Sequence, residues 1–228
     1  TGNSATVTNG VYTTGTQTIS GLKTFTGGLL SEGAGTRSFR AGTSAGATSQ
    51  GQSSVAVGSN AGQTTQGGSA VAVGYSAGAS TQGGNSVAVG NRAGQTTQNI
   101  NSVAIGSYAG NNTQGLSSVA VGQSAGQTTQ GDKSVAVGAQ AGNSGQGASS
   151  VAVGIFAGQT NQGANGIVIS SLGTVVNNTV AGHIIIRSST ANITSAGNTA
   201  NWTHSGTWLA GSDKRLKKDI NPITDALS

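Results

Sequence analysis

The sequence predicts an all-β protein built as a parallel β-solenoid with 16-residue coils. Three observations support this fold class: a repeat with a period of 16, a short alternation of branched and small residues in each repeat, and little charge. Of the 228 residues 40 are glycine, one is proline and 7% are charged, whereas soluble domains carry roughly 25% charge. Disordered chains are usually rich in charge or proline. The glycines do not recur at every third position, as collagen requires. Repetitive β-structure fits this composition best.

Residues 1–38 are expected to form an N-terminal fibre connector that caps the repeats, because the end coils of a solenoid lack a neighbour on one side. The stretch VYTTGTQTISGLKTF, residues 11–25, resembles the QTISGxKTF segments of bacteriophage tail fibres. That resemblance implies a short β-rich connector in a trimeric shaft. Without it, the stretch reads as a solvent-exposed hairpin with Gly15 and Gly21 at its turns.

Residues 39–169 carry the repeat, and each coil is expected to hold two short strands and two turns. The SVAVG part alternates with period two, which is typical of a strand, and the AGQTTQG part supplies the second strand and a turn. Alternation places the two branched residues on one face and the alanine between them on the other. We expect the branched side chains to fill the interior as the structural core: Val55, Val57, Val71, Val73, Val87, Val89, Val103, Ile105, Val119, Val121, Val135, Val137, Val151 and Val153.

The alanines between these residues are then expected to point outward and to let another chain approach closely. Two branched side chains per coil bury little apolar area against the entropy lost when 16 residues are ordered. We therefore expect an obligate homo-oligomer whose chains meet through an alanine face: Ala56, Ala72, Ala88, Ala104, Ala120, Ala136 and Ala152.

A glutamine recurs in every coil, and stacked amides can form a hydrogen-bonded ladder along the solenoid axis. The predicted ladder comprises Gln50, Gln66, Gln82, Gln98, Gln114, Gln130, Gln146 and Gln162. A structural role is favoured for these glutamines, and contact with a receptor is the alternative role. The paired threonines of QTTQ are expected to point to opposite faces, which argues against a flat ice-binding surface.

The coil resembles the head repeats of YadA-like trimeric autotransporter adhesins, through its SVAVG strand and the Ala-Gly pair that follows in step. The resemblance covers residues 39–169 and implies a left-handed parallel β-roll in a homotrimer. The commoner coil of that family has 14 residues, so we expect the two additional residues to enlarge a turn.

Residues 170–211 are expected to form a β-rich transition or cap, and residues 212–228 to begin a further domain. The string SDKRLKKDI resembles the opening of the peptidase S74 intramolecular chaperone, which assists trimer assembly and then cuts itself off. The resemblance implies cleavage between Ser212 and Asp213, with Ser212 and Lys217 as the catalytic dyad and a short helix after the cut. A lysine can serve as the base when burial lowers its pKa. We expect no enzymatic activity from the chain as given, and a single self-cleavage by a longer precursor.

These features predict a structural and attachment segment of a trimeric viral tail fibre or spike on the virion surface. It would be a rigid spacer, with two copies of itself, other virion fibre proteins and a host glycan or protein as partners. A bacterial trimeric autotransporter adhesin on the cell surface is the first alternative. A fibre-borne glycan hydrolase is the second, although the five carboxylates show no catalytic pairing. No cofactor, metal, nucleic acid or membrane insertion is expected, since the sequence has no cysteine, no long basic stripe and no apolar run of helix-spanning length.

Overall fold

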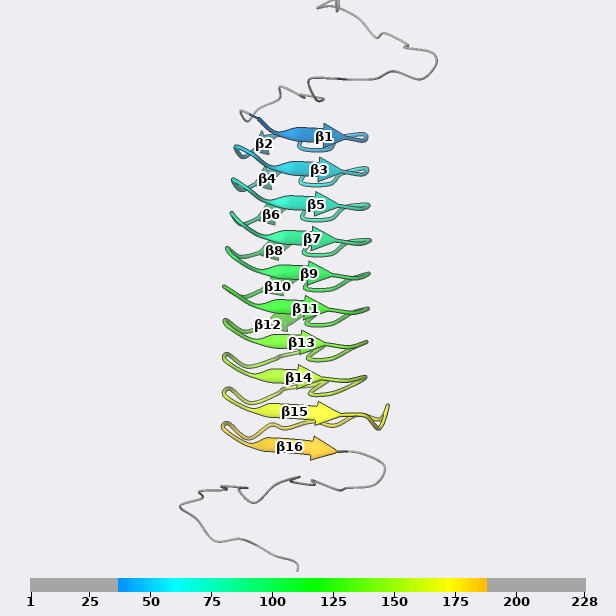
Figure 1. Ribbon diagram of the computed structural model, residues 1–228, viewed down its shortest axis with the longest axis vertical. Helices are drawn as coiled ribbons and strands as arrows, with labels where there is room; N and C mark the ends of the chain where they lie inside the picture. Colours follow the sequence, from blue (N-terminus) through cyan, green and yellow to red (C-terminus); the bar gives the residue numbers. More distant parts are fainter. Residues whose placement is uncertain (1–36, 188–228) are drawn as a thin grey trace, which may run out of the picture. The chain divides into compact units, whose positions relative to one another are not determined.

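A computed structural model describes residues 37–187, which form an all-β parallel solenoid of about nine turns (Figure 1). No helix occurs in this described range. The larger of the two sheets contains ten strands in the order β1 (Phe39–Ala41), β3 (Val55–Val57), β5 (Val71–Val73), β7 (Val87–Val89), β9 (Val103–Ile105), β11 (Val119–Val121), β13 (Val135–Val137), β14 (Val151–Val153), β15 (Ile167–Ser170) and β16 (Ile184–Arg187). The smaller contains β2 (Ser49–Gln50), β4 (Thr65–Gln66), β6 (Thr81–Gln82), β8 (Thr97–Gln98), β10 (Thr113–Gln114) and β12 (Thr129–Gln130).

The predicted period of 16 is confirmed by the strand register. Val87 pairs with Val103 and Val103 with Val119, so equivalent residues of successive coils lie side by side in both sheets. The period changes at the C-terminal end, where Ile167 pairs with Ile184 at an offset of 17 and Ala157 bridges Val176 at an offset of 19. The parallel ladder thus continues past Ile169 and takes in β16, which lies within the segment predicted as a β-rich cap.

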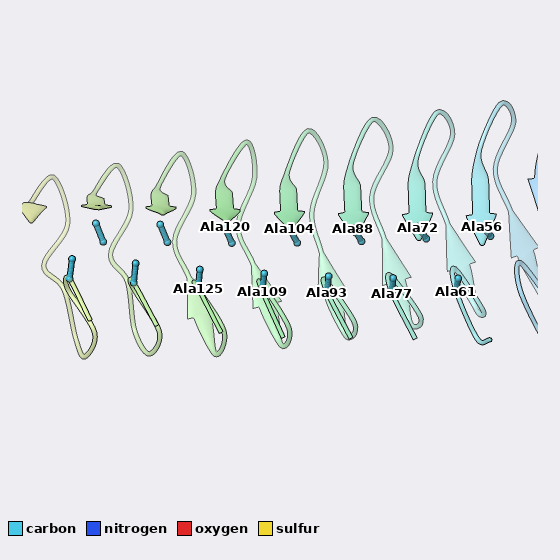
Figure 2. Close-up of a cluster of buried hydrophobic side chains, with 14 of the residues drawn as sticks. Ala56, Ala61, Ala72, Ala77, Ala88, Ala93, Ala104, Ala109, Ala120 and Ala125 are labelled. Carbon is cyan, nitrogen blue, oxygen red and sulfur yellow. The ribbon is translucent and has the colours of Figure 1, made fainter. Parts of the chain in front are cut away.

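The interior of the solenoid is lined by alanine, which is the reverse of the predicted arrangement. Ala56, Ala72, Ala88, Ala104, Ala120, Ala136 and Ala152 have no solvent exposure, and a second row from the Ala-Gly pairs faces them across the coil (Figure 2). The branched residues predicted as core lie on the outer face of the large sheet. Of these, Val55, Val57, Val71, Val73, Val87, Val89, Val103, Val119, Val121, Val135, Val151 and Val153 are half-buried, whereas Ile105 and Val137 are exposed.

The width of the coil explains this reversal. A typical coil encloses two alanine methyl groups, one serine and one glutamine amide between its two sheets, as Ala56, Ala61, Ser54 and Gln66 illustrate. The glutamine takes the space that two branched side chains would need. Since strand side chains alternate between faces, placing the alanine inside forces both of its branched neighbours outward.

At the C-terminal end of the solenoid, the alanine rows and the amide column of the interior both change composition. Val168 and Ile185 continue the alanine row of the large sheet, and Val176 occupies the place of the second alanine. Asn178 follows Gln162 as the buried amide and donates to the carbonyl oxygen of His183 at 2.7 Å. Larger aliphatic groups thus accompany a shorter amide, which keeps the interior filled at the density that folded proteins maintain.

Candidate interaction surfaces

The outer face of the large sheet carries two parallel columns of apolar side chains. One column runs from Phe39 through the first valine of each coil to Ile184, and the other ends at Ile169 and Ile186. Neither column contains a charged residue within the described strands. Large side chains in it are well exposed, with Ile105 at 40% and Ile184 at 62% of their surface. We call these columns the apolar face. A continuous apolar sheet surface of this kind marks an interaction site.

The glutamine column lies inside the solenoid and braces its two sheets. The Gln98 amide nitrogen donates to the carbonyl oxygen of Val87 at 2.8 Å and to Oε1 of Gln114 at 3.1 Å. Amide–amide bonds also join Gln66 to Gln82, Gln82 to Gln98 and Gln130 to Gln146, so the predicted ladder is formed over part of its length. The ladder is interrupted, and the Oε1 atoms of Gln50, Gln66, Gln130 and Gln162 are buried without a partner. All eight side chains are at most 3% exposed, which places them out of reach of a receptor.

A serine row accompanies the glutamines, and the sequence analysis did not identify it. The buried hydroxyl of Ser118 donates to the carbonyl oxygen of Gly115 at 2.7 Å, and Ser134 makes the same bond to Gly131 at 2.6 Å. Each bond closes the turn before a strand of the large sheet. The signal was available, because the same small hydroxyl residue precedes the first valine in most coils. Ala70 is the one alanine at this position among the described coils.

Hydroxyl groups cover the outer surface of the small sheet. Thr64 and Thr65 are both exposed, and so are Thr128 and Thr129. The prediction that these neighbours point to opposite faces is therefore wrong. The chain turns just before each two-residue strand, so strict alternation does not yet hold at the first threonine. Two adjacent ranks of hydroxyls result, with Asn112 as an amide substitute in one of them.

The turns that follow the strands of the large sheet are small or polar in most coils, with two departures: Ile155 and Phe156 follow β14, and aromatic rings gather around Arg92. The Arg92 guanidinium carbon lies 6.0 Å from the ring centre of Tyr75 and 5.6 Å from that of Tyr108. Its Nη1 also donates to the Tyr108 hydroxyl at 3.1 Å. Cation–π contacts of this length are attractive. These three residues come from three successive coils.

The predicted dyad of Ser212 and Lys217, together with Asp213 and the helix expected after it, lies outside the described residues. Nearly all of the predicted connector, residues 1–38, does as well. Within residues 37–187 no group of three or more His, Cys, Asp or Glu side chains is placed to hold a metal ion. The same range contains no helix that is long and apolar enough to span a bilayer.

Comparison of the chain with protein-family models, curated proteins and solved structures found no match.

Proposed function

We propose that this chain is a rigid segment of a homotrimeric attachment fibre or spike, in which three solenoids pack through their apolar faces. The apolar face is the observation that carries this proposal. It runs along all ten strands of the large sheet, lacks charge, and exposes valine and isoleucine to water in a single chain. Covering it with copies of itself supplies the apolar burial that the alanine interior cannot provide.

The geometry favours self-association over a different partner, because the face repeats at one fixed spacing along its whole length. Strands of successive coils lie about 4.8 Å apart, so another copy presents a surface of the same period. The number three and the left-handed roll rest on the resemblance to YadA-like head repeats. The proposed interface differs from the one expected at first, since the branched columns replace the alanines.

The viral assignment rests on the two terminal motifs. The connector-like stretch before the repeats and the SDKRLKKDI string after them both resemble parts of phage tail fibres, and that string favours a virion over a bacterial surface. In this proposal the solenoid spaces the attachment apparatus from the particle. A longer precursor would cut itself between Ser212 and Asp213 after assembly.

Sedimentation equilibrium of the chain, at several concentrations, tests the trimer. We expect a mass of three chains, that is three times 21.9 kDa, with a β-rich circular dichroism spectrum. Val103→Glu and Val119→Glu together place charge on the apolar face and are expected to dissociate or unfold the assembly. A folded chain that sediments as a monomer would overturn the proposal.

The hydroxyl ranks favour a second candidate function, the ordering of water or the binding of ice. Six strands of the small sheet repeat a hydroxyl at about 4.8 Å on a rigid backbone. Thermal hysteresis of the purified chain tests this candidate. A freezing point equal to the melting point, at millimolar protein, would exclude it.

A further inference from the structure

We propose that Tyr75, Arg92 and Tyr108 form a binding site for an acidic saccharide, a sugar bearing a carboxylate or a sulfate. The inference rests on the proposed attachment function and specifies the class of receptor. We call these three residues the Tyr–Arg–Tyr site. It lies on the turns that follow β5, β7 and β9, beyond the end of each strand of the large sheet.

The site interrupts a series of small and polar turn residues that extends to the turn after β13, before Ile155 and Phe156 follow β14. The neighbouring coils carry Ser59 and Asn60 at these two turn positions on one side, and Gln123 and Ser124 on the other. The chain has only three tyrosines, and two of them lie here around one arginine. Since the fold tolerates serine or asparagine at the same positions, coil formation does not require the aromatic rings.

The Arg92 side chain is positioned by its bond to the Tyr108 hydroxyl and by both rings, and its backbone is bonded to the two neighbouring coils. The Arg92 backbone N–H donates to the carbonyl oxygen of Tyr75 at 2.8 Å, and the Arg92 carbonyl oxygen accepts from Nδ2 of Asn111 at 2.8 Å. Asn111 also donates to Oε1 of Gln95 at 3.1 Å, which fixes the asparagine in turn. A site organised before the ligand arrives loses less entropy on binding.

Charge selects the kind of ligand. Between residues 37 and 187 the sequence has one carboxylate side chain, Asp132, and its Oδ1 accepts from the backbone N–H of Leu116. No carboxylate of the described residues therefore pairs with Arg92, which donates one side-chain hydrogen bond, to Tyr108. A guanidinium carries five N–H groups in a planar fork that fits a carboxylate or sulfate.

The rings select a sugar among the anions. Tyr75 exposes 47% of its surface, and Tyr108 is half-buried, so each presents an aromatic surface beside the cation. Such surfaces pack against the apolar C–H faces of a sugar ring. The Tyr108 hydroxyl accepts from Arg92 and keeps its own O–H as a donor to a ligand. A small free anion would use the arginine alone and gain nothing from the rings.

The experiment measures binding of the full chain to an array of carboxylated, sulfated and neutral oligosaccharides, followed by titration calorimetry with sialyllactose and with lactose. We expect acidic members to bind and lactose, which lacks the carboxylated sugar, to bind at least about tenfold more weakly. Comparing the binding of carboxylated oligosaccharides with that of sulfated ones shows which acidic group the site prefers. Arg92→Asn and Tyr75→Ser should each weaken binding about tenfold or more.

Matched controls separate the site from general charge. Asn60 occupies the turn position of Arg92 in another coil, and Arg92 and Lys133 both have positive φ, at 54° and 56°, so asparagine suits either position. Lys133→Asn removes the same charge elsewhere and should leave binding unchanged. Equal weakening by Lys133→Asn, or no binding to any acidic oligosaccharide, would overturn the site.

The oligomeric state distinguishes this inference from the proposed function. If Arg92→Asn changes the sedimenting mass and not the saccharide affinity, Arg92 is a contact between chains and the inference is wrong. A trimer without saccharide binding rejects the site alone. A monomer that binds acidic saccharides rejects the trimeric fibre alone.

Discussion

The side-chain amide of Gln98 crosses the interior of the solenoid and donates to the backbone carbonyl oxygen of Val87 at 2.8 Å. Gln98 belongs to β8 of the small sheet and Val87 to β7 of the large sheet, so one side chain ties the two sheets of a coil together. The same amide accepts from Gln82 at 3.2 Å and donates to Gln114 at 3.1 Å. The column therefore links the two sheets within a coil, and it links successive coils from Gln66 to Gln114 and from Gln130 to Gln146.

Replacing this amide by a hydrocarbon of similar size should be costly. Gln98→Leu removes the amide donor to the Val87 carbonyl oxygen and to Oε1 of Gln114 inside the solenoid. It also removes the oxygen that accepts from the Gln82 amide, which keeps its bond to the carbonyl oxygen of Val71. Each buried polar group left unpaired costs about 1–3 kcal/mol. We expect Gln98→Leu to lower the free energy of unfolding by about 2–5 kcal/mol, measured by urea denaturation at one fixed protein concentration. Thr97→Val changes the neighbouring side chain on the outer surface and should cost less than about 1 kcal/mol. Equal losses in the two variants would contradict the bracing role.

A carboxyl at the same position should make stability depend on pH. Burial disfavours an ionised carboxylate, so the carboxyl introduced by Gln98→Glu should have a higher pKa in the folded chain than its value of about 4.3 in the unfolded chain. Between these two values the folded state binds more protons, and stability falls as the pH rises. We expect the difference in melting temperature from the parent chain to be smallest below about pH 4.3 and to widen toward neutral pH. A difference independent of pH would show that the side chain turns out to solvent.

The reversed strand faces make opposite predictions for two adjacent residues. Ala104 is fully buried between its neighbours in the stack, so Ala104→Leu overpacks the interior and should destabilise the fold by about 1–3 kcal/mol. Val103 lies on the apolar face, so Val103→Ala keeps the interior intact and should mainly weaken self-association. Urea denaturation of both variants measures their stability, and sedimentation of the folded protein measures their self-association. If Ala104→Leu were stable and Val103→Ala unfolded, the branched residues would be inside and the alanines outside, as first predicted from the sequence.

The sequence was sufficient for the fold class, the period and the glutamine column, because each depends on residues that recur in step. It was not sufficient for the orientation of the strand, since alternation separates two faces without saying which one is inside. A signal for the orientation was nevertheless present. The first column of the apolar face contains residues as different as Phe39, Val87 and Ile167, whereas the row between the two columns is alanine in every coil from Ala56 to Ala152. A row restricted to one small side chain indicates a limit on space, which an interior imposes and a surface does not.

Part of the Tyr–Arg–Tyr site was readable from the spacing, because Arg92 and Tyr108 are one period of 16 apart. Tyr75 occupies the neighbouring position of the repeat, and the stacking of turns brings its ring to Arg92 as well. The serine row was also readable as a recurring small hydroxyl residue, and its interruption at Ala70 provides a natural comparison. Ala70→Ser adds a hydroxyl where the other coils have one, and it should raise the free energy of unfolding by about 0.5–1.5 kcal/mol. Ser118→Ala should lower it by a similar amount, because it removes the bond to Gly115.

Glycine follows the first eight strands of the large sheet, from Gly42 to Gly154, and the stacking of coils requires it there. One substitution can show this requirement. Gly90 has φ of +132°, and a Cβ atom there would lie 2.7 Å from the carbonyl oxygen of Gly106 in the next coil. The backbone of Gly106 cannot move aside as the end of a flexible side chain can. Gly90→Ala must therefore separate the two coils or change the turn. We expect the free energy of unfolding, measured by urea denaturation, to fall by more than about 3 kcal/mol, or no folded protein to form.

Gly68 is the matched control, because the nearest atom to a Cβ there is the Gln52 carbonyl oxygen at 3.5 Å and its φ is not in the left-handed region. Gly68→Ala should leave stability within about 1 kcal/mol of the parent, and it should gain slightly from the reduced entropy of the unfolded chain. If Gly90→Ala were as stable as Gly68→Ala, the coils could not be stacked as closely as the parallel register requires.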